Sequence, residues 1–200
     1  YGLVEDSDYS AVGIAPSLQG STFRLRHAQG EWPARIRLPG RHNLLNALAA
    51  AAAAREIGIP LDAVLEGLGA LERVPGRLEP VEAGQSFAVF VDYAHTGSAL
   101  AAVLGALGEL PHRRILTVFG CGGDRDKSKR GPMGAAACAG SDLGLATSDN
   151  PRGEDPMDIL REIEAGMRGG GFDNFQIVPD RREAIFEAVR LAQQGDVVLI

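Results

Sequence analysis

Five short apolar runs between residues 87 and 200 constrain the fold of the chain more than any other feature. Strands buried on both faces have this character, and stretches with helical character lie between the runs. The repeated strand-helix order predicts an α/β fold with a Rossmann-like, mostly parallel sheet and helices on both faces. The runs are "FAVFVDYA" (87–94), "RILTVFG" (114–120), "LGLATSD" (143–149), "FQIVPD" (175–180) and "DVVLI" (196–200). The helical stretches lie near 97–109, 130–140, 155–168 and 181–194.

The first part of the chain has a different pattern. "STFRLRH" and "EWPARIRLP" alternate apolar with polar residues, and "AQG" between them offers a hairpin turn, so residues 1–40 are predicted to be antiparallel and β-rich. Helices at 41–57 and 61–72 should follow. "RVPGR", at 73–77, then breaks the pattern with a proline and a glycine. We therefore place a domain boundary here, between residues 75 and 76.

Composition narrows the classes of partner. With 20 basic and 26 acidic residues among 200, a broad nucleic-acid surface is not expected, although a local basic pocket for a small anion remains possible. Cys121 and Cys138 are too few for a disulfide scaffold or a zinc site, which favours a reducing cytoplasm. No run of about 18 apolar residues is present, so we expect no membrane insertion.

Polar clusters follow three of the predicted strands. Asp92 and His95 come after the first, "GCGGDRDKSKR" after the second and "SDNPR" after the third. The carboxyl ends of parallel strands share one edge of a sheet, so these clusters should meet there. The last strand stops at Ile200, where the next edge loop would begin, and we infer a truncated protein with an incomplete site.

The glycine-rich segment 119–131 suggests an anion site. Its glycines can let the backbone approach a ligand, and Arg125, Lys127, Lys129 and Arg130 offer donors and positive charge. The alternative is a glycine turn with solvated charges. It is not an ATP phosphate loop, because G-x-x-x-x-G-K-[ST] occurs nowhere in the chain.

The cluster "DNPR", at 149–152, has two interpretations from its residues alone. Asp, Asn and Pro are common in turns, and the following "EDP" could open a helix. An acid, an amide, a rigid proline and an arginine at a strand end could equally form a binding pocket. The residues leave these interpretations evenly matched.

Two further pairs could contact a nucleotide. Asn43 and Asn46 lie three residues apart at the start of a predicted helix, so both can occupy one face and offer a donor and an acceptor to an adenine edge. Helix capping explains Asn43 as readily. Asp92 could accept from ribose hydroxyls or cap the helix after it, and His95 could contact the nucleotide or pack against the loop.

Taken in order, "GRHNLLNALAAAAAA", "VPGRLE", "VDYAHT", "FGCGGDRDKSKRGPMG" and "TSDNPR" resemble the Mur ligases of peptidoglycan synthesis, most closely the branch that adds meso-diaminopimelate. The resemblance covers the chain from about residue 40. It implies that 1–75 is the C-terminal part of the central ATPase domain and 76–200 the C-terminal domain, truncated at its end. The phosphate loop, a carbamylated lysine and most Mg²⁺ ligands would then precede Tyr1, and a glycine-lysine-rich substrate loop would follow Ile200.

The resemblance also implies a reaction, in which ATP and Mg²⁺ drive amide formation between UDP-N-acetylmuramoyl-L-alanyl-D-glutamate and meso-diaminopimelate through an acyl phosphate. Because the missing parts carry the phosphate loop, the chain alone is expected to be inactive, and we assign it no catalytic or metal-binding residue. By resemblance, Arg152 binds the distal carboxylate of diaminopimelate. The implied diaminopimelate residues are Arg125, Asp149, Asn150, Pro151 and Arg152, and the implied ATP residues are Asn43, Asn46, Arg77, Asp92 and His95.

One departure from the family and two alternatives remain. The chain has Gly97 and Ser98 where the family has Pro and an acid after His-Thr, which weakens the start of that helix. A lysine-adding, folylpolyglutamate or cyanophycin ligase would share the domain plan, although Arg152 speaks against it. A non-catalytic module that binds a nucleotide or an anion is the alternative from another class.

Overall fold

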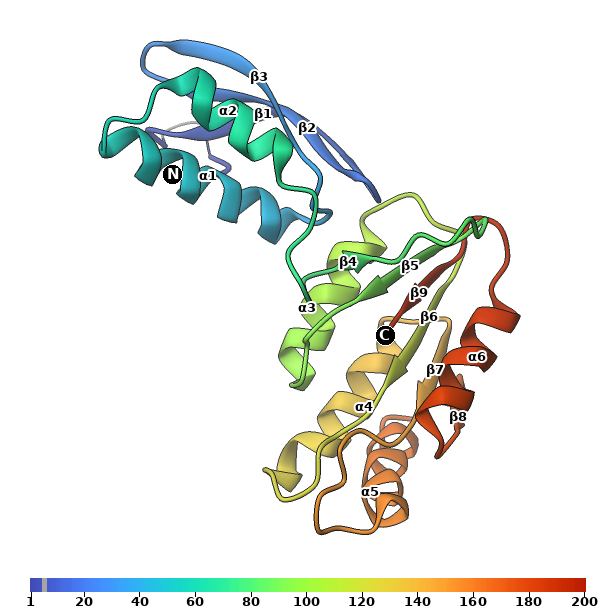
Figure 1. The fold of residues 1–200 in the computed structure, drawn as a ribbon. Coiled ribbons are helices and arrows are strands. Elements are labelled where there is room, and N and C mark those ends of the chain that lie inside the picture. Colours follow the sequence, from blue (N-terminus) through green and yellow to red (C-terminus); the bar gives the residue numbers. More distant parts are fainter. Residues whose placement is uncertain (5–6) are drawn as a thin grey trace. The chain divides into compact units, whose positions relative to one another are not determined.

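A computed structural model describes residues 1–4 and 7–200, which form two compact units. The first comprises residues 1–79 with 109–111, and the second comprises residues 80–108 with 112–200. The first unit contains β1 (Ser10–Ser17), β2 (Gly20–His27), β3 (Gly30–Ile36), α1 (Arg41–Glu56) and α2 (Leu61–Ala70) (Figure 1).

The first unit is an antiparallel sheet, in the order β1-β2-β3, packed against two helices. The predicted hairpin is confirmed, because His27 pairs with Gly30 across a two-residue turn. Alternation along β2 buries Phe23 and Leu25, which join Leu44 and Leu48 of α1 in the core. The short apolar side chains along α1 therefore serve packing against a sheet.

The alanine-rich helix α1 ends at a glycine. Gly58 has a φ of 89°, and its N–H donates to the carbonyl oxygen of Arg55. The N–H of Ile59 donates to the carbonyl oxygen of Ala54. This pair of bonds is a Schellman motif, which favours glycine at the left-handed position.

The second unit is built on a six-stranded sheet in the order β4-β5-β9-β6-β7-β8. From β5 to β8 every neighbouring pair is parallel. The strands are β4 (Glu79–Pro80), β5 (Ala88–Val91), β6 (Ile115–Phe119), β7 (Leu143–Ala146), β8 (Phe175–Ile177) and β9 (Val197–Leu199). The helical segments are α3 (Gly97–Gly108), η1 (Lys127–Lys129), α4 (Arg130–Ala139), α5 (Pro156–Gly169) and α6 (Arg181–Leu191).

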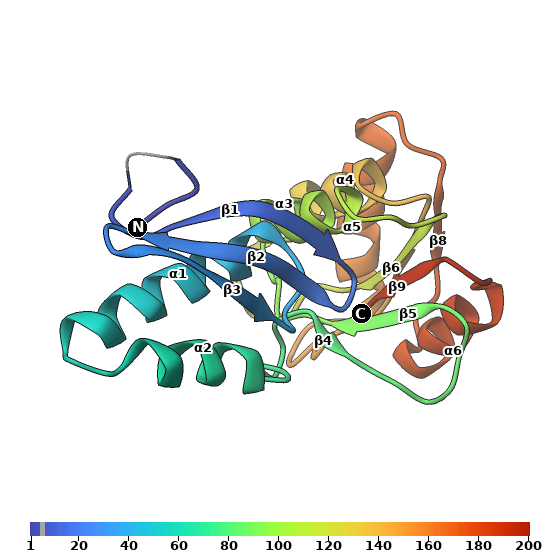
Figure 2. The ribbon, with the colours of Figure 1, turned by 90° about the horizontal axis from the view of Figure 1, so that it is seen from above.

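Helices cover both faces of this sheet (Figures 1 and 2). Helix α6 lies on one face, where Ala184 and Ala188 pack on Leu116, Leu145 and Val198. Helices α3, α4 and α5 lie side by side on the other face. The predicted α/β class, parallel strands and two-faced helix cover are confirmed.

Close contact between glycines fixes α4 against α5. A Cβ atom on Gly166 would lie 2.7 Å from the carbonyl carbon of Gly131, and one on Gly134 would lie 2.8 Å from the carbonyl oxygen of Ile163. Such distances leave no room for a side chain, so the two backbones touch. The helix pair consequently forms a rigid support beneath the loops that precede it.

The helices of the second unit begin where the sequence predicts. Thr96 accepts from the N–H of Ala99 at the start of α3, so Gly97 and Ser98 do not prevent the helix there. Asp155 accepts from the N–H of Met157 and caps α5. No helix in the described part of the chain is both long and apolar enough to cross a membrane.

Candidate ligand-binding site

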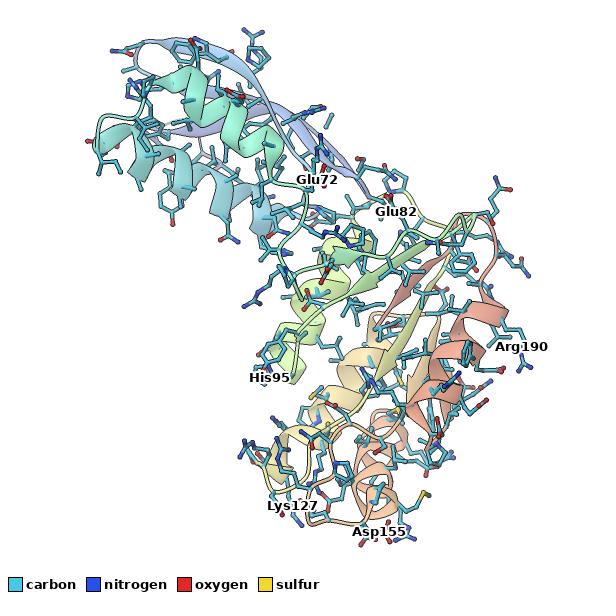
Figure 3. The ribbon with its side chains drawn as sticks, viewed as in Figure 1. Glu72, Glu82, His95, Lys127, Asp155 and Arg190 are labelled. Atoms are coloured by element: carbon cyan, nitrogen blue, oxygen red, sulfur yellow. The ribbon has the colours of Figure 1, made fainter. Side chains whose placement is uncertain are left out.

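Two loops at the carboxyl edge of the second sheet carry all five of the predicted diaminopimelate residues. Residues 120–126 follow β6, and residues 147–155 follow β7, which is its parallel neighbour. Figure 3 shows His95, Lys127 and Asp155 at the same end of this unit, where β5, β6 and β7 end. The sequence prediction that the polar clusters share one edge is therefore confirmed.

The glycines of the first loop are needed for its contact with the second. A Cβ atom on Gly123 would overlap the carbonyl oxygen of Pro151 and lie 2.6 Å from its carbonyl carbon. One on Gly120 would lie 2.8 Å from the Cβ atom of Asp149. The sequence predicts that these glycines let the backbone approach a ligand, but at these two positions the neighbouring loop occupies the space.

Hydrogen bonds join the two loops in both directions. The N–H of Gly123 donates to the carbonyl oxygen of Asn150 at 3.2 Å, and the N–H of Gly153 donates to Oδ2 of Asp124 at 2.9 Å. Nη1 of Arg152 donates to the carbonyl oxygen of Gly123 at 2.8 Å and to that of Asn150 at 3.3 Å. The loops therefore form one folded element.

Arg152 has donors beyond this tie. The side chain is exposed, and the structure shows no hydrogen bond from its Nε or Nη2 atoms to the described residues. A guanidinium carries five N–H donors in a planar fork. Arg152 can thus hold the loop through Nη1 and present its remaining donors to a carboxylate.

The backbone of these loops is unusual at three non-glycine residues. Asn150, Arg152 and Asp124 have φ values of 48°, 53° and 52°. Asn and Asp tolerate this left-handed region, but a residue such as arginine is disfavoured there by roughly 1–2 kcal/mol. Arginine at position 152 is therefore not explained by the backbone conformation, which supports a role for its side chain.

A charge network lies beneath the loops. Oε1 of Glu154 accepts from the N–H of Asp124 at 2.7 Å and from Nη2 of Arg130 at 2.8 Å. Oε2 pairs with Nζ of Lys127 at 3.0 Å, while Nη1 of Arg130 also reaches Glu162 at 3.0 Å. The side chain of Arg130 is 1% exposed. The sequence predicts Arg130 and Lys127 as donors for an anionic ligand, but the carboxylate of Glu154 already pairs with both.

These contacts lower the pKa of Glu154 from its ordinary 4.5 to about 2, chiefly through the hydrogen bonds from Arg130 and then that from the Asp124 N–H. A depressed folded pKa adds stability that is complete above pH 4.5 and is lost as the pH falls towards 2. We expect amide exchange in 120–127 and 150–155 to accelerate through this window, ahead of the strands. Hydrogen-exchange mass spectrometry on a pH series checks this, after correction for intrinsic exchange rates, and equal acceleration in β6 and β7 would contradict it.

The other four predicted diaminopimelate residues lie on the same two loops as Arg152. Arg125 is exposed on the first loop, with no hydrogen bond or ion pair to the described residues. Asp149 and Asn150 are exposed on the second loop, and Pro151 between Asn150 and Arg152 is partly buried. All five therefore lie on the two joined loops.

The predicted ATP residues of the first unit differ in exposure. Asn43 is 4% exposed, and its Nδ2 donates to the carbonyl oxygen of Pro39 at 2.7 Å. The capping alternative is wrong, since Gly40 precedes the helix and Asn43 lies inside its first turn. Asn46 and Arg77 are exposed, whereas Asn43 is buried, so of the two asparagines only Asn46 presents its amide at the surface.

The predicted ATP residues of the second unit follow β5. Oδ1 of Asp92 accepts from the N–H of Ala94 at 2.9 Å, so its carboxylate shapes the turn, whereas the cap of α3 is Thr96. The exposed ring of His95 lies 5.0 Å from the ring of Tyr93, and its Nδ1 is 3.0 Å from the carbonyl oxygen of Tyr93. Both predicted residues consequently follow the carboxyl end of β5.

The described residues contain neither a group of metal ligands nor an exposed thiol. Within residues 1–4 and 7–200, no three His, Cys, Asp or Glu side chains are grouped to hold a metal ion. Cys121 and Cys138 are free and buried. Burial raises the pKa of the Cys121 thiol to about 11, so this thiol stays protonated at neutral pH.

A groove of about 610 Å³ lies in the first unit, lined by β2, β3 and α2. Phe23, Pro33 and Leu65 form its apolar part, and Arg35 and Arg37 its charged part. None of the predicted site residues lines it. The chemistry proposed for the chain therefore does not involve this groove.

Comparison with known proteins decides the family. The family model described as "Mur ligase, glutamate ligase domain" matches residues 76–200. The chain belongs to the Mur ligase family. Residues 76–200 include both joined loops and the strands β5, β6 and β7. The family that the motifs of this sequence resemble is thereby confirmed.

Relatives within the Mur ligase family are more specific. The "UDP-N-acetylmuramoyl-L-alanyl-D-glutamate--2,6-diaminopimelate ligase" of Syntrophomonas wolfei is 46% identical over 200 residues, covering 100% of this chain and 41% of that relative. A solved structure of a ligase with the same name has a TM-score of 0.72 at 38% identity, covering 98% of this chain and 40% of the other. The chain thus spans about two fifths of the length of such relatives.

A more distant neighbour shows how far the fold extends. Mycobacterium tuberculosis folylpolyglutamate synthase, solved with ADP and AMPPCP, has a TM-score of 0.73 at 24% identity, covering 98% of this chain and 45% of that one. At this identity the likeness shows the fold alone. Because a different ligase shares the fold, the residues of the loops must carry any argument about the substrate.

The sequence alone did not reveal the charge network of Glu154 and Arg130 beneath the two joined loops. Glu154 was considered only as part of a helix start, and Arg130 only as one cation in a basic run. A usable signal was present, because "RGEDP" has two adjacent acids and Asp155 alone suffices to cap α5. The surplus acid implied a second role for Glu154.

Proposed function

We propose that the protein is an ATP-dependent amide ligase that adds meso-diaminopimelate to UDP-N-acetylmuramoyl-L-alanyl-D-glutamate in peptidoglycan precursor synthesis. The names of relatives at 46% and 42% identity support this assignment. The observation that carries it is the pair of exposed arginines, Arg125 and Arg152, on loops that hydrogen bonds hold together. The proposed partners are these two small molecules, with no nucleic acid, and the proposed location is the cytoplasm.

The proposed role of Arg152 is to bind the distal carboxylate of diaminopimelate, with Arg125 assisting at the near end. Asp149 and Asn150 complete the pocket, and Pro151 fixes the backbone between them and Arg152. The distal carbon of diaminopimelate bears an ammonium and a carboxylate. Lysine has only the ammonium at that end of its side chain. An arginine facing that ammonium would meet a like charge, so this pocket disfavours lysine.

ATP supplies the phosphoryl group that activates the substrate carboxylate as an acyl phosphate, with Mg²⁺ screening the phosphates. In the described residues, the proposed contacts to its nucleoside are Asn46, Arg77, Asp92 and His95, from the set that the family resemblance implies. The exposed Asn46 and the edge position of Asp92 fit this role. Asn43, buried and bonded to Pro39, fits only as a support for the start of α1.

The activity has a direct test. A ligase of the relatives' full length that carries this chain should release phosphate only when ATP, Mg²⁺, UDP-N-acetylmuramoyl dipeptide and meso-diaminopimelate are all present. Omission of any one should reduce the rate to background. Turnover of a folate or of lysine in place of diaminopimelate would support another ligase of the same fold, and nucleotide binding without turnover would support a non-catalytic module.

Asn46 offers a test of the nucleotide assignment. We expect Asn46→Ala to raise KM for ATP by roughly 2- to 10-fold, because one neutral hydrogen bond contributes about 0.5–1.5 kcal/mol. KM for diaminopimelate and the thermal midpoint should stay near wild type, since the side chain is exposed. Asn43→Ala is the matched contrast and should mainly lower stability. An unchanged KM for ATP in Asn46→Ala would remove Asn46 from the site.

A further inference from the structure

Glu154 makes contacts that its place in the sequence does not require. It directly precedes Asp155, whose side chain already caps α5 by accepting from Met157. The carboxylate of Glu154 instead crosses to the other loop and accepts from the backbone N–H of Asp124 at 2.7 Å. Glu154, on the loop that carries Arg152, thus fixes the backbone next to Arg125 on the other loop.

The partner of Glu154 is anchored in the helices. Arg130 is the first residue of α4, and its guanidinium, with a side chain 1% exposed, lies between Glu154 and Glu162 of α5. Next to it, Gly131 touches Gly166 and joins the two helices. The guanidinium of Arg130 is therefore held in place by the helices. Glu154, which belongs to one loop and binds the backbone of the other, links both loops to it.

We propose that Glu154 and Arg130 are positioning residues for substrate choice, which set the separation of Arg125 and Arg152 by joining the two loops to the α4–α5 pair. This inference rests on the proposed function for its substrate, but its structural part stands independently. A substrate with carboxylates at both ends needs two cationic anchors at a fixed separation, and a loose loop would lose that match. Glu154 and Arg130 themselves do not touch the substrate in this arrangement.

Glu154→Gln tests the joining role, with Glu162→Gln as its matched control. Glutamine keeps only one acceptor oxygen. Whichever way its amide turns, the N–H₂ group faces donors, either the Asp124 N–H and Arg130 or Arg130 and Lys127, so the join should loosen. Glu162→Gln also removes a carboxylate from Arg130 but leaves the bond to Asp124. In the full-length ligase, hydrogen exchange in 120–127 and 150–155 should accelerate in Glu154→Gln and stay near wild type in Glu162→Gln.

Kinetics supply the second readout. We expect Glu154→Gln to raise KM for diaminopimelate about tenfold or more, with KM for ATP within about twofold, because a loosened pocket loses its charge-assisted pairs. Glu154→Asp retains the charge but is one methylene shorter, and should fall between wild type and Glu154→Gln. Arg130→Lys, which cannot bridge two carboxylates with a planar fork, should behave like Glu154→Gln.

The outcomes separate this inference from the proposed function. Faster loop exchange with unchanged KM for diaminopimelate would overturn the role in substrate choice and leave the ligase assignment intact. Unchanged exchange in Glu154→Gln would overturn the join itself. A wild-type enzyme that does not turn over diaminopimelate would refute the proposed function and, with it, the role in substrate choice. The hydrogen-exchange data would still decide whether Glu154 joins the loops. If Glu154→Gln, Glu154→Asp and Arg130→Lys all unfolded and lost activity with both substrates, the two residues would serve the stability of the fold and not substrate choice.

Discussion

Replacement of Arg152 by alanine is expected to raise KM for meso-diaminopimelate by roughly 30- to 1,000-fold, equivalent to about 2–4 kcal/mol. A charge-assisted pair in a closed site has about this strength, and its loss leaves a substrate carboxylate without a partner. KM for ATP should change little, because the proposed nucleoside contacts lie on other segments. Steady-state kinetics on the full-length ligase, with each substrate varied in turn, measure the difference.

The tie between Arg152 and Gly123 requires a control. Arg152→Ala removes both the proposed grip and the observed hydrogen bond to the Gly123 carbonyl, so its thermal midpoint should also fall. Arg152→Lys keeps a cation that can donate to this carbonyl, but an ammonium cannot reproduce a planar two-pronged grip. We expect lysine to restore stability while KM for diaminopimelate stays high. If lysine restored both, or if alanine lowered only the thermal midpoint, Arg152 would serve the loop and not the substrate.

Substitution of Gly123 by alanine should have the next largest effect. The added Cβ atom would overlap the carbonyl oxygen of Pro151, which belongs to the backbone and cannot rotate away as the end of a flexible side chain could. Overpacking of this kind costs about 1–3 kcal/mol, and more where the backbone must move. We expect a lower free energy of unfolding together with a raised KM for diaminopimelate, because the shift displaces the loop that carries Arg152. Denaturant titration and steady-state kinetics measure the two effects.

Gly105→Ala on α3 is the matched control for this substitution. In the described part of the chain nothing lies within 4 Å of a Cβ atom at Gly105, so alanine should fit. It should stabilise the helix by about 0.5–1 kcal/mol and leave both KM values unchanged. Gly166→Ala adds a second comparison, since it should lower stability through the α4–α5 contact. Wild-type behaviour of Gly123→Ala would mean that the loops are not in close contact.

Periodicity and turn chemistry were sufficient to predict the α/β class and most of the strands and helices along the chain. The buried strands β5, β6 and β7 have short apolar runs, and their helices begin at residues with clear caps, such as Thr96 and Asp155. The strand order could not be predicted, because β9 inserts between β5 and β6 although it is last in sequence. That pairing depends on contacts between distant segments, which no local pattern encodes.

The candidate site was predicted less completely, for a physical reason. Exposed residues such as Arg125 and Asn46 could be proposed from their chemistry alone. Asn43 has the same chemistry as Asn46, but its side chain turns inward to Pro39, and burial cannot be told from three-residue spacing. Glu154 and Gly123 act on a loop about 30 residues away, so their roles emerged only when both loops were placed together.

The ratio of kcat/KM for meso-diaminopimelate to that for lysine, in the wild-type full-length ligase and in Arg152→Ala, tests the central claim most directly. We predict strong preference for diaminopimelate in the wild type. In Arg152→Ala the ratio should fall, because the substrate carboxylate loses its partner while lysine no longer faces a like charge. Lysine should remain a poor substrate even then. A wild type that prefers lysine, or a ratio that is the same in both proteins, would contradict the assignment of the two joined loops as a diaminopimelate pocket.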